Sequence, residues 1–500
     1  MHPSVNFARL WIALIALAAL GGCSLAPAYK PPSVVVGGAF KEDGPWRVAS
    51  PGDELPRGAW WLRYEDSTLT GLEARVDAEN PDIGIAAARY AESRALAAEA
   101  DAGRYPALAA GTAISHARQS DNRPLRSASQ PAEYRDFAIG GALSYELDLW
   151  GRVRDLVAIG RTSAQASAAD VEAVRLSLHA ELAIDYFNLR GLDAEAQLLR
   201  DTEVIYRRAL ELTQSRHTGG AASGLDVARA ESQLETNAAQ ITDATLRRAL
   251  IEHAIARLVG EVPASFAVPI SAELAAVPTL PIGVPSTLLE RRPDIGAAER
   301  RVAAANSGIG VARAGYFPRV TLTANGGFES TGAADWLSAP NRYWSIGPQL
   351  LLAVFDAGVH RAEVARAKSV LNESSERYRA VVLSAFQEVE DYLALLNRTQ
   401  EEFAQQAAAA QSAQRALDLA TNRYTNGAVS YLEVVVSQTA ALQARRAVLV
   451  LQGRELIASI GLIRGLGGGW SSADLKQAAY GPSTIADGEI THNNVASGTN

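Results

Sequence analysis

Apolar residues recur at helical spacing through most of this chain. Between Arg152 and His217 the sequence is rich in Ala, Leu, Glu, Arg and Gln, with apolar positions such as Val171, Val174 and Leu178. At about 1.5 Å per residue, an unbroken helix of this length approaches 100 Å. Helices this long need neighbours along their whole extent, as in a coiled coil. The pattern therefore predicts long helices packed side by side.

Proline and glycine divide this helical pattern into two halves. Proline is absent from residues 132–262 and from 349–481, whereas six prolines occur from Pro263 to Pro293. Each half is interrupted once by a short stretch that contains glycine, at 217–224 and at 426–430. We expect these two interruptions to be the tips of helical hairpins.

Elsewhere the apolar period changes from helical to alternating, which predicts four strands of about ten residues. The predicted ranges are 107–116, 135–148, 319–329 and 344–355. A tilted strand of this length crosses a bilayer. Aromatic residues gather near the predicted strand ends, where an interfacial girdle would place them: Tyr105, Trp150, Tyr316, Phe317, Trp336, Tyr343, Trp344 and Phe355. Four strands cannot close a spanning sheet alone, so a spanning chain must oligomerise, and three copies would give twelve strands.

The two halves are copies of each other. Pro-Asp-Ile-Gly opens a small-residue helix pattern at Pro81 and again 212 positions later at Pro293, and both copies close on an aromatic residue followed by proline. Further along, Gly151 and the first tip match Gly358 and the second tip at an offset of 207. This period is too long for a solenoid repeat. It indicates duplication of a structural half, with a first repeat at 59–262, a Pro-rich connector at 263–285 and a second repeat at 286–469.

Composition narrows the class of partner. The 500 residues are 48% hydrophobic, which is ample for a large core, and the formal net charge is −8. No run of Lys or Arg provides the clustered basic surface that a nucleic-acid partner requires. We therefore expect no nucleic-acid partner.

The N-terminus reads as a signal peptide at 1–22, too short in its apolar core to span a membrane. The sole cysteine, Cys23, follows small residues at the end of this segment, which resembles a bacterial lipobox with Cys23 as the acylated first residue of the mature chain. The alternative is a plain secretory signal with an incidental cysteine. In known lipoproteins, Ser at the second mature position, here Ser24, directs the chain to the outer membrane. We expect residues 23–58 to form a lipid-anchored tether and residues 470–500 to form a disordered tail.

Several motifs with possible chemistry have simpler explanations. None of the seven histidines belongs to a metal-binding HExxH pattern. Gly308 and Gly310 lie in an Ala-rich helix pattern with no preceding strand, so close helix packing explains them better than a dinucleotide site does. Arg291 and Arg292 precede a helix whose N-terminus would repel them, so we expect both to lie outside it and to bond carboxylates. We expect no catalytic residue, metal or cofactor.

Separated motifs along the chain resemble one family. The matching residues are Cys23 with Ala26–Tyr29; Trp60–Trp61 with Asp66, Leu69 and Leu72; Asn80 and Ile83; Tyr145–Arg152; and Arg291–Ile295 with Ala298–Glu299, Ala304–Asn306, Ile309–Ala312 and Phe317–Pro318. Together these residues, in this order, resemble TolC-like outer-membrane efflux proteins of the lipoprotein branch. The resemblance runs from the signal peptide to about Gly469.

This resemblance implies a membrane protein of mixed α and β structure. It implies a homotrimer with a twelve-stranded β-barrel, four strands from each chain, continuous with a long periplasmic α-helical barrel. It also implies a periplasmic adaptor protein and an inner-membrane transporter as partners, and outer-membrane lipid around the barrel. The transporter would supply the energy, and this chain would catalyse no reaction.

Within the family, the helix tips form the closed periplasmic aperture and contact the adaptor. By position, Asp226 and Tyr424 match residues that bridge neighbouring helix pairs in the closed state, and Glu433 matches an acidic residue that lines the constriction. The expected adaptor contacts are Arg216, Gly220, Ser223, Leu225, Arg423, Gly427, Ser430 and Leu432. The chain departs from the pattern at Val436, a place often held by a second Asp, and at Val429, which can be Arg. The alternative role for Asp226 and Glu433 is to stabilise helix first turns through the helix dipole.

The implied function is an outer-membrane channel that exports small toxic compounds or drugs through a trimeric duct gated at its helix tips. Two alternatives stay open. The same fold serves as the exit duct of protein-secretion and metal-efflux systems. A lipid-anchored periplasmic coiled-coil scaffold without a pore would also explain the helical pattern.

Overall fold

The computed structural model describes residues 24–34, 40–42, 59–124, 127, 129, 131–278 and 291–470. The predicted signal peptide, Cys23, most of the predicted tether and residues 471–500 of the predicted tail lie outside the described residues. The chain forms two compact units. One, here called the sheet unit, comprises Met1–Ser33, Tyr90–Ser167 and Ala298–Tyr378. The other, here called the hairpin unit, comprises Val34–Arg89, Ala168–Ala297 and Arg379–Asn500.

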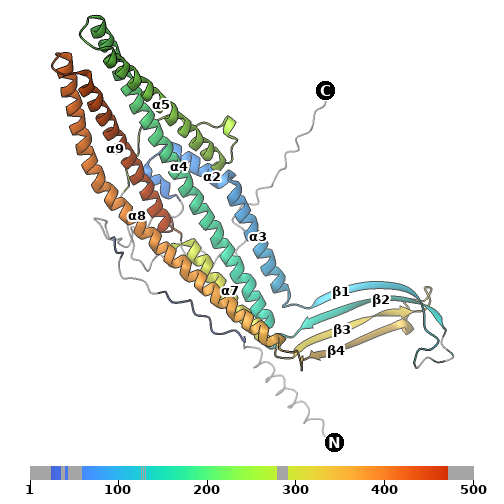
Figure 1. Ribbon diagram of the computed structural model, residues 1–500. Coiled ribbons are helices and arrows are strands. Elements are labelled where there is room, and N and C mark those ends of the chain that lie inside the picture. The colour runs from blue at the N-terminus through green and yellow to red at the C-terminus, as the bar shows by residue number, and fades with distance from the viewer. Residues whose placement is uncertain are drawn as a thin grey trace, which may run out of the picture. The chain divides into compact units, whose positions relative to one another are not determined.

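The sheet unit contains one antiparallel sheet of four strands in chain order (Figure 1). Its strands are β1 (Ala107–Arg118), β2 (Glu133–Glu146), β3 (Arg319–Ser330) and β4 (Arg342–Leu351). The two inner strands pair with neighbours on both sides. The edge strands β1 and β4 each have one partner strand within the described part of the chain. The sheet therefore presents two rows of backbone groups that are free to pair with another chain.

Three strands both begin and end within two residues of the predicted limits, but β4 ends at Leu351 and not at residue 355. The prediction is wrong there because the partner strand supplies no further pairing. Leu351 pairs with Arg319, the first residue of β3, and the preceding Pro318 has no N–H to donate. Beyond the strand, the Asp356 carboxylate accepts hydrogen bonds from the backbone N–H groups of Gly358 and His360. This segment therefore forms a cap for the next helix.

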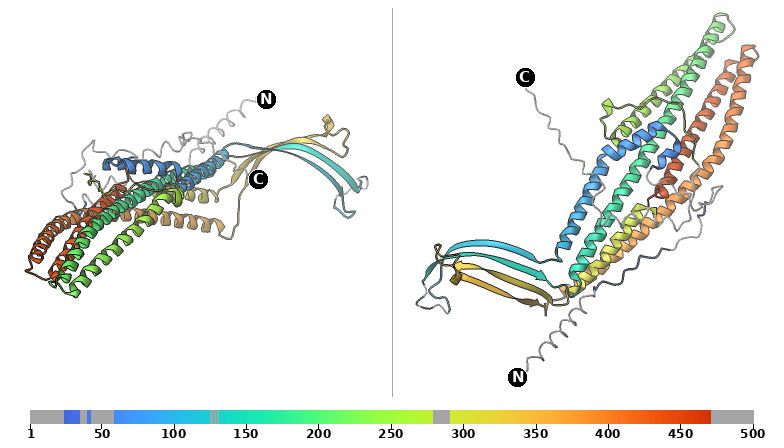
Figure 2. Two further views of the ribbon diagram at one scale, coloured as in Figure 1. Left: turned by 90° about the horizontal axis from the view of Figure 1, so that it is seen from above. Right: turned by 180° about the vertical axis from the view of Figure 1, so that it is seen from behind.

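Two long hairpins make up much of the remaining chain, and further views show them side by side (Figure 2). The first consists of α4 (Arg152–Thr218) and α5 (Gly224–Leu258), and the second of α8 (Val359–Thr425) and α9 (Tyr431–Gly465). Helices α4 and α8 both have 67 residues, and α5 and α9 both have 35. Each bound of the second hairpin lies 207 positions after that of the first. A 67-residue helix is about 100 Å long, as the apolar pattern predicts.

Two shorter helices precede the strands. They are α3 (Pro81–Ala102) and α7 (Pro293–Ala314), each with 22 residues and each starting at the duplicated Pro-Asp-Ile-Gly motif. Proline suits the first position of a helix because its missing N–H has no intrahelical partner there. No described helix is long and apolar enough to cross a membrane.

The main hydrophobic core lies in the hairpin unit. The 3-10 helix η1 (Trp60–Tyr64) and α2 (Ser67–Glu79) pack on α4 and α9, and Trp60 and Tyr186 are among the largest fully buried side chains. Asp66 ends the turn between η1 and α2, since its carboxylate accepts the N–H groups of Thr68 and Leu69 as an N-cap. The Trp-Trp motif of the sequence therefore serves as core.

Candidate functional site

The two hairpin tips are built by the same local chemistry. Gly220 and Gly427 follow the ends of α4 and α8 with φ of 73° and 76°, a left-handed conformation that favours glycine. The N–H of Ala221 donates to the Arg216 carbonyl at 2.8 Å, and at the second tip the N–H of Ala428 donates to the Arg423 carbonyl at 2.9 Å. The duplication thus extends to single backbone hydrogen bonds.

The helix starts after the tips differ. Ser223 and Asp226 form a capping box in which each side chain accepts the backbone N–H of the other. At the equivalent place Ser430 makes no side-chain cap, and the Glu433 carboxylate lies 3.8 Å from the Arg423 guanidinium instead. Both of these side chains are more than half exposed. Glu433 is therefore a solvent-facing acid with a loosely held cation beside it.

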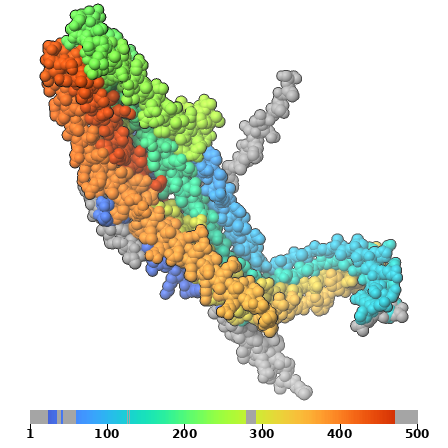
Figure 3. All heavy atoms as spheres, viewed as in Figure 1, coloured from blue at the N-terminus to red at the C-terminus, as the bar shows by residue number. Residues whose placement is uncertain are grey.

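Arg216 connects the first hairpin to the second. Its Nη1 donates to the carbonyl oxygen of Tyr424 at 2.7 Å, and its Nη2 donates to that of Thr425 at 2.6 Å. These are the last carbonyls of α8, which have no N–H partner within the helix. The guanidinium also lies 4.6 Å from the centre of the Tyr424 ring. In the space-filling view the ends of the two hairpins lie against each other (Figure 3).

Tyr424 is the centre of a small buried cluster beneath this contact. Its side chain packs with Tyr431, Val434 and Ala230, so that α5, α8 and α9 all contribute. The rings of Tyr424 and Tyr431 are 5.4 Å apart, and the Tyr424 hydroxyl lies 3.3 Å from that of Thr213, which is fully buried. Burial raises the pKa of Tyr431 to about 12, so this phenol stays neutral. The two hairpins therefore share one core at the level of the tips.

The structure does not bring the Asp226 carboxylate to the Tyr424 hydroxyl. Asp226 bonds Ser223 and lies 3.5 Å from Arg229 on its own helix. At the tips, Tyr424 instead contacts Arg216 and Thr213 of the first hairpin. Leu225, Leu432 and Val436 are exposed. The roles of these residues in a gate or an adaptor contact stay predictions. Both tips carry an acid at this place, Asp226 and Glu433, but only Glu433 lies beside the arginine that ends the preceding helix among the described contacts.

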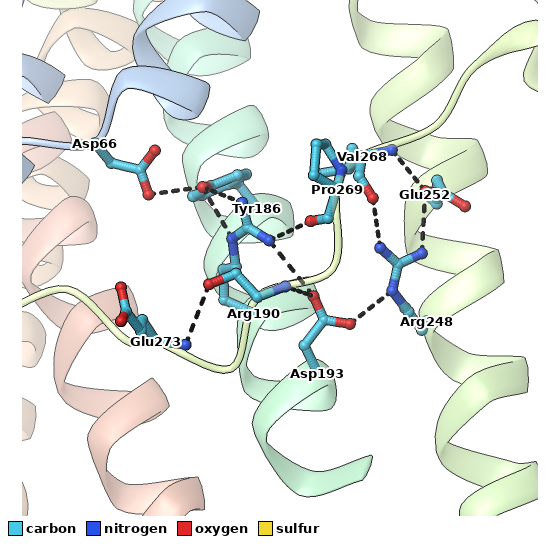
Figure 4. A network of polar contacts seen from close by, with 10 residues as sticks. Asp66, Tyr186, Arg190, Asp193, Arg248, Glu252, Val268, Pro269 and Glu273 are labelled. Atoms are coloured by element: carbon cyan, nitrogen blue, oxygen red, sulfur yellow. Dashed lines mark hydrogen bonds and ion pairs between the residues drawn. The ribbon is translucent and has the colours of Figure 1, made fainter. Parts of the chain in front are cut away.

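Further from the tips, a buried polar network joins α4 and α5 to the start of the connector (Figure 4). Asp193 is almost fully buried, and its carboxylate accepts Arg248 Nε at 2.7 Å and the N–H of Ser271 at 3.1 Å. Arg190 Nε donates to the Tyr186 hydroxyl at 2.9 Å, and that hydroxyl donates to Asp66 Oδ2 at 2.6 Å. Burial, with the hydrogen bond to Asp66, raises the pKa of Tyr186 to about 12.

A second buried pair joins α2 to α4. His179 Nδ1 lies 2.5 Å from Glu73 Oε2 and its Nε2 lies 3.2 Å from Asp77 Oδ1, while Trp61 stacks on the imidazole at 4.4 Å. Burial alone would lower the pKa of His179, but the hydrogen bonds to Asp77 and Glu73 outweigh it and raise that pKa to about 9. The imidazole is therefore charged at neutral pH.

The prediction for Arg292 is confirmed. It lies just before α7 and donates to the carboxylates of Asp294 and Glu388 at 2.7 and 2.8 Å, and to the Gly465 carbonyl at 3.0 Å. Sequence reasoning missed the networks of Asp193 and His179, because their partners are distant in the chain. The available signal was the presence of His and Asp at positions of α4 that fall on its buried face.

The geometry consists of two duplicated hairpins tied at their tips and a four-stranded sheet with two edges open to a further chain. A family model described as "Outer membrane efflux protein" matches residues 74–261 and 284–468. The chain belongs to the outer membrane efflux protein family. The TolC-like resemblance noted from the motifs is thereby confirmed.

Relatives cover nearly the whole of this outer membrane efflux protein. The pyoverdine export outer membrane protein OpmQ of Pseudomonas aeruginosa is 31% identical over 468 residues, which cover 91% of this chain and 95% of that protein. The cation efflux system protein CusC of Escherichia coli is 29% identical over 457 residues, covering 90% and 97%. The solved structure of the outer-membrane channel OprN has a TM-score of 0.84 at 29% identity, covering 90% of this chain and all of that one. This efflux protein is thus an outer-membrane channel of an efflux pump.

Proposed function

We propose that this outer membrane efflux protein forms a homotrimeric duct that carries small toxic organic compounds from the periplasm to the exterior. The observation that carries this proposal is the sheet whose edge strands β1 and β4 have one partner each among the described residues. Within a bilayer, unpaired backbone groups cost several kcal/mol each, so the edges require strands from other chains. Three copies would close a twelve-stranded barrel by pairing β4 of one chain with β1 of the next.

The periplasmic gate of this duct would lie at the hairpin tips. Arg216 and Tyr424 hold the two hairpins of one chain together, and we assign the opening motion to the loss of this contact. Asp226 and Glu433 would face neighbouring chains at the aperture, where three copies of the exposed Glu433 carboxylate would favour cations. With Val436 in place of a second acid, closure would depend more on packing than on charge.

A periplasmic adaptor would dock on the hairpins. A cavity of about 500 Å³ lies between them, lined by Leu225, Ser232, Thr236, Val435, Thr439 and Leu442 among others. The buried side-chain oxygens of Gln233 and Asn237 in this lining have no hydrogen-bond partner within the described structure. Unsatisfied buried acceptors of this kind suit donors from a partner protein. The inner-membrane transporter would supply the energy, and the duct itself would conduct without catalysing a reaction.

The mature chain would be anchored in the outer membrane by acyl groups on Cys23, which lies outside the described residues. A thioether-linked diacylglyceryl group with an N-linked acyl chain would hold it more firmly than a single chain can, since each buried CH₂ contributes about 0.8 kcal/mol.

An organic cargo has more support than a metal. Soft cations such as Cu(I) prefer thiolate and thioether ligands. This chain has one cysteine and one methionine, Cys23 and Met1, both in the N-terminal segment that precedes the duct. The relatives OpmQ and CusC are named for pyoverdine export and cation efflux, so the fold itself does not select between these cargoes.

Deletion of the gene tests the proposal. Minimum inhibitory concentrations would be measured for antibiotics, dyes, detergents, organic solvents, Cu⁺ and Ag⁺, with and without the wild-type chain supplied in trans. We expect at least a fourfold loss of resistance to several organic compounds, restored by the wild-type chain. A loss of resistance confined to Cu⁺ and Ag⁺ would favour metal efflux. A protein missing from the culture medium of the deletion strain would favour protein secretion. A purified protein that is monomeric and does not conduct in lipid bilayers would favour a scaffold.

A further inference from the structure

A pocket of about 600 Å³, here called the wall pocket, lies in the hairpin unit where α4 passes between α5 and α9 (Figure 1). All three helices contribute to its lining, which is mainly apolar. The apolar side chains include Leu192, Leu250, Ile251, Leu449, Val450 and Ile457. Sites for small molecules have volumes of about 300–1,000 Å³ and a mainly apolar lining with a few polar groups. The wall pocket therefore has the size and lining of a small-molecule site.

Two glycines inside helices keep the wall pocket open. Gly191 of α4 and Gly453 of α9 both line it, and a Cβ at either position would meet no atom within 4 Å in the described structure. Glycine is among the least favourable residues in the interior of a helix. At the offset of 207, the duplicate positions carry Arg398 and Leu246, so the equivalent helices accept large side chains there. The two glycines therefore leave room for a molecule other than this chain.

The glycines of α7 show how close packing differs from such open space. At Gly310 a Cβ would overlap Asp155 Oδ2 and lie 2.8 Å from the backbone nitrogen of Ala26, so close packing is confirmed as the reason for this glycine. At Gly308 a Cβ would meet nothing within 4 Å in the described structure, so close packing is wrong as the reason there. Unlike Gly308, the two glycines of the wall pocket belong to different helices and line one cavity.

Three arginines surround the apolar surface of the wall pocket. Arg247 Nη2 donates to Glu195 Oε2 at 3.3 Å, and Arg446 Nη2 donates to the other oxygen of the same carboxylate. Arg454 Nη1 donates to Glu402 Oε2 at 3.0 Å. The pair of Arg247 with Glu195 is equivalent to the pair of Arg454 with Glu402 at the offset of 207. The duplication therefore accounts for two of the three arginines.

Arg446 is the additional cation. Its duplicate position carries Ala239, and its side chain shares the Glu195 carboxylate with another arginine. Two further acids that pair with the arginines, Asp243 and Glu402, are more than half exposed and lie outside the lining. Within the lining, three guanidinium groups therefore face one carboxylate. This excess of positive charge favours an anion.

The wall pocket lies on the face of α4 opposite to the connector. Arg190 and Asp193 bond backbone groups of the connector, whereas Asn188, Gly191 and Glu195 line the pocket. A helix turns by about 100° per residue, so these two sets of residues point in opposite directions. The η1–α2 layer packs on the same side of α4 as the connector. A duct needs an unobstructed interior, so this layer belongs outside the proposed duct and the pocket faces into it.

We infer that the wall pocket is a binding site in the wall of the duct for an amphipathic organic anion. The apolar body of the ligand covers Leu250 and Val450, which are each 59% exposed. Its carboxylate or sulfonate binds Arg446, since a guanidinium donates two parallel hydrogen bonds to a planar anion. This inference rests on the duct proposed above and adds a class of ligand to its organic cargo.

Two fluorescent probes of similar size test the site in the full-length protein, purified and reconstituted into lipid nanodiscs. Anilinonaphthalenesulfonate carries an anionic group, and phenylnaphthylamine is its uncharged counterpart. The signal of nanodiscs without protein is subtracted at each probe concentration. We expect wild type to bind the sulfonate saturably, with one site per chain. Wild type that binds no more of either probe than the lipid does would overturn the site.

A matched pair of glycine variants tests whether the probes bind in the wall pocket. Gly453→Leu fills the pocket with the side chain found at the duplicate position. Gly84→Leu makes the same change at an exposed position of α3, where a Cβ also meets nothing within 4 Å in the described structure. We expect Gly453→Leu to weaken the binding of both probes at least tenfold and Gly84→Leu to leave it within twofold of wild type. Equal affinities in the two variants would overturn the site.

Arg446→Gln separates the effect of charge from that of packing. It removes the additional cation and leaves Glu195 paired with Arg247. We expect it to weaken binding of the sulfonate at least fivefold and to leave binding of the uncharged probe within twofold of wild type. An equal change for both probes would overturn the preference for anions.

The oligomeric state and the conductance of the same preparation distinguish this inference from the proposed function. A conducting trimer that binds neither probe would overturn the site and leave the duct intact, and a pocket filled by a second copy of the chain would give this result. A monomer that binds the sulfonate without conducting would refute the duct, and with it the placement of the pocket in a duct wall.

Discussion

The guanidinium of Arg216, at the end of α4, donates a hydrogen bond to the carbonyl of Tyr424 at the end of α8 and lies over its ring. One side chain thus adds a second donor to the Tyr424 carbonyl, which also accepts the N–H of Gly427, places a positive charge at the negative end of the helix dipole and covers a buried phenol. The contact orders the tips. Because Arg216 itself is partly exposed to solvent, a docking partner would be able to reach this contact and break it.

Arg216→Ala should weaken the closed arrangement of the tips. Loss of a charge-assisted hydrogen bond costs about 1.5–3 kcal/mol, and about 1.4 kcal/mol is a tenfold change in an equilibrium. Cells that produce this variant should become at least fourfold more sensitive to vancomycin, which is too large for ordinary porins. Arg207→Ala is the control, since Arg207 lies on the same helix and pairs with Glu203 of that helix in an exposed contact. Equal sensitivity of the two variants would contradict the role of Arg216.

The His179 pair should make stability depend on pH. An unfolded histidine has a pKa near 6.5, and the folded value is raised to about 9. The stabilisation is therefore fully present below about pH 6.5 and is lost as the pH rises through about 9.

Thermal unfolding of the detergent-solubilised protein, followed by circular dichroism at pH 6 and pH 10, measures this effect. From pH 6 to pH 10 the midpoint of thermal unfolding of wild type should fall further than that of His179→Gln. The difference between the midpoints of the two proteins should therefore be smaller at pH 10. A difference in midpoint that is the same at both pH values would show that the imidazole is not held in its charged form.

Asp193→Ala should be strongly destabilising. It would leave the guanidinium of Arg248 buried without its nearest carboxylate and weaken the position of Arg190. Breaking a buried ion pair costs about 3–5 kcal/mol. The midpoint of thermal unfolding should fall by several degrees. Asp201→Ala, which changes an exposed acid eight residues further along the same helix, should leave the midpoint within about one degree.

Local sequence determines the parts of this fold that were predicted well. Gly220 and Gly427 identify both tips because only a left-handed residue ends these helices, and the alternating pattern after Pro318 identifies β3. The end of β4 was misplaced, because strand length depends on where the partner strand begins. The polar networks were not predictable, since Glu73 and His179 are 106 positions apart and a buried charge has the same appearance in a sequence as an exposed one.

The candidate site was predicted at the level of segments and not of contacts. The tips were placed correctly, but which side chain bridges them depends on how two hairpins from distant parts of the chain pack. Arg216 was expected to contact an adaptor, and Asp226 to meet Tyr424. Within the chain, Arg216 contacts Tyr424, and Asp226 caps its own helix.

Single-channel conductance of the purified protein in planar lipid bilayers tests the central claim most directly, that three chains form a duct closed at the hairpin tips. Wild type should give small, cation-selective currents, Glu433→Gln should reduce that selectivity, and a variant with both Arg216→Ala and Tyr424→Ala should conduct several-fold more. The absence of conductance in wild type and in the double variant alike, from protein that is correctly inserted, would contradict the account.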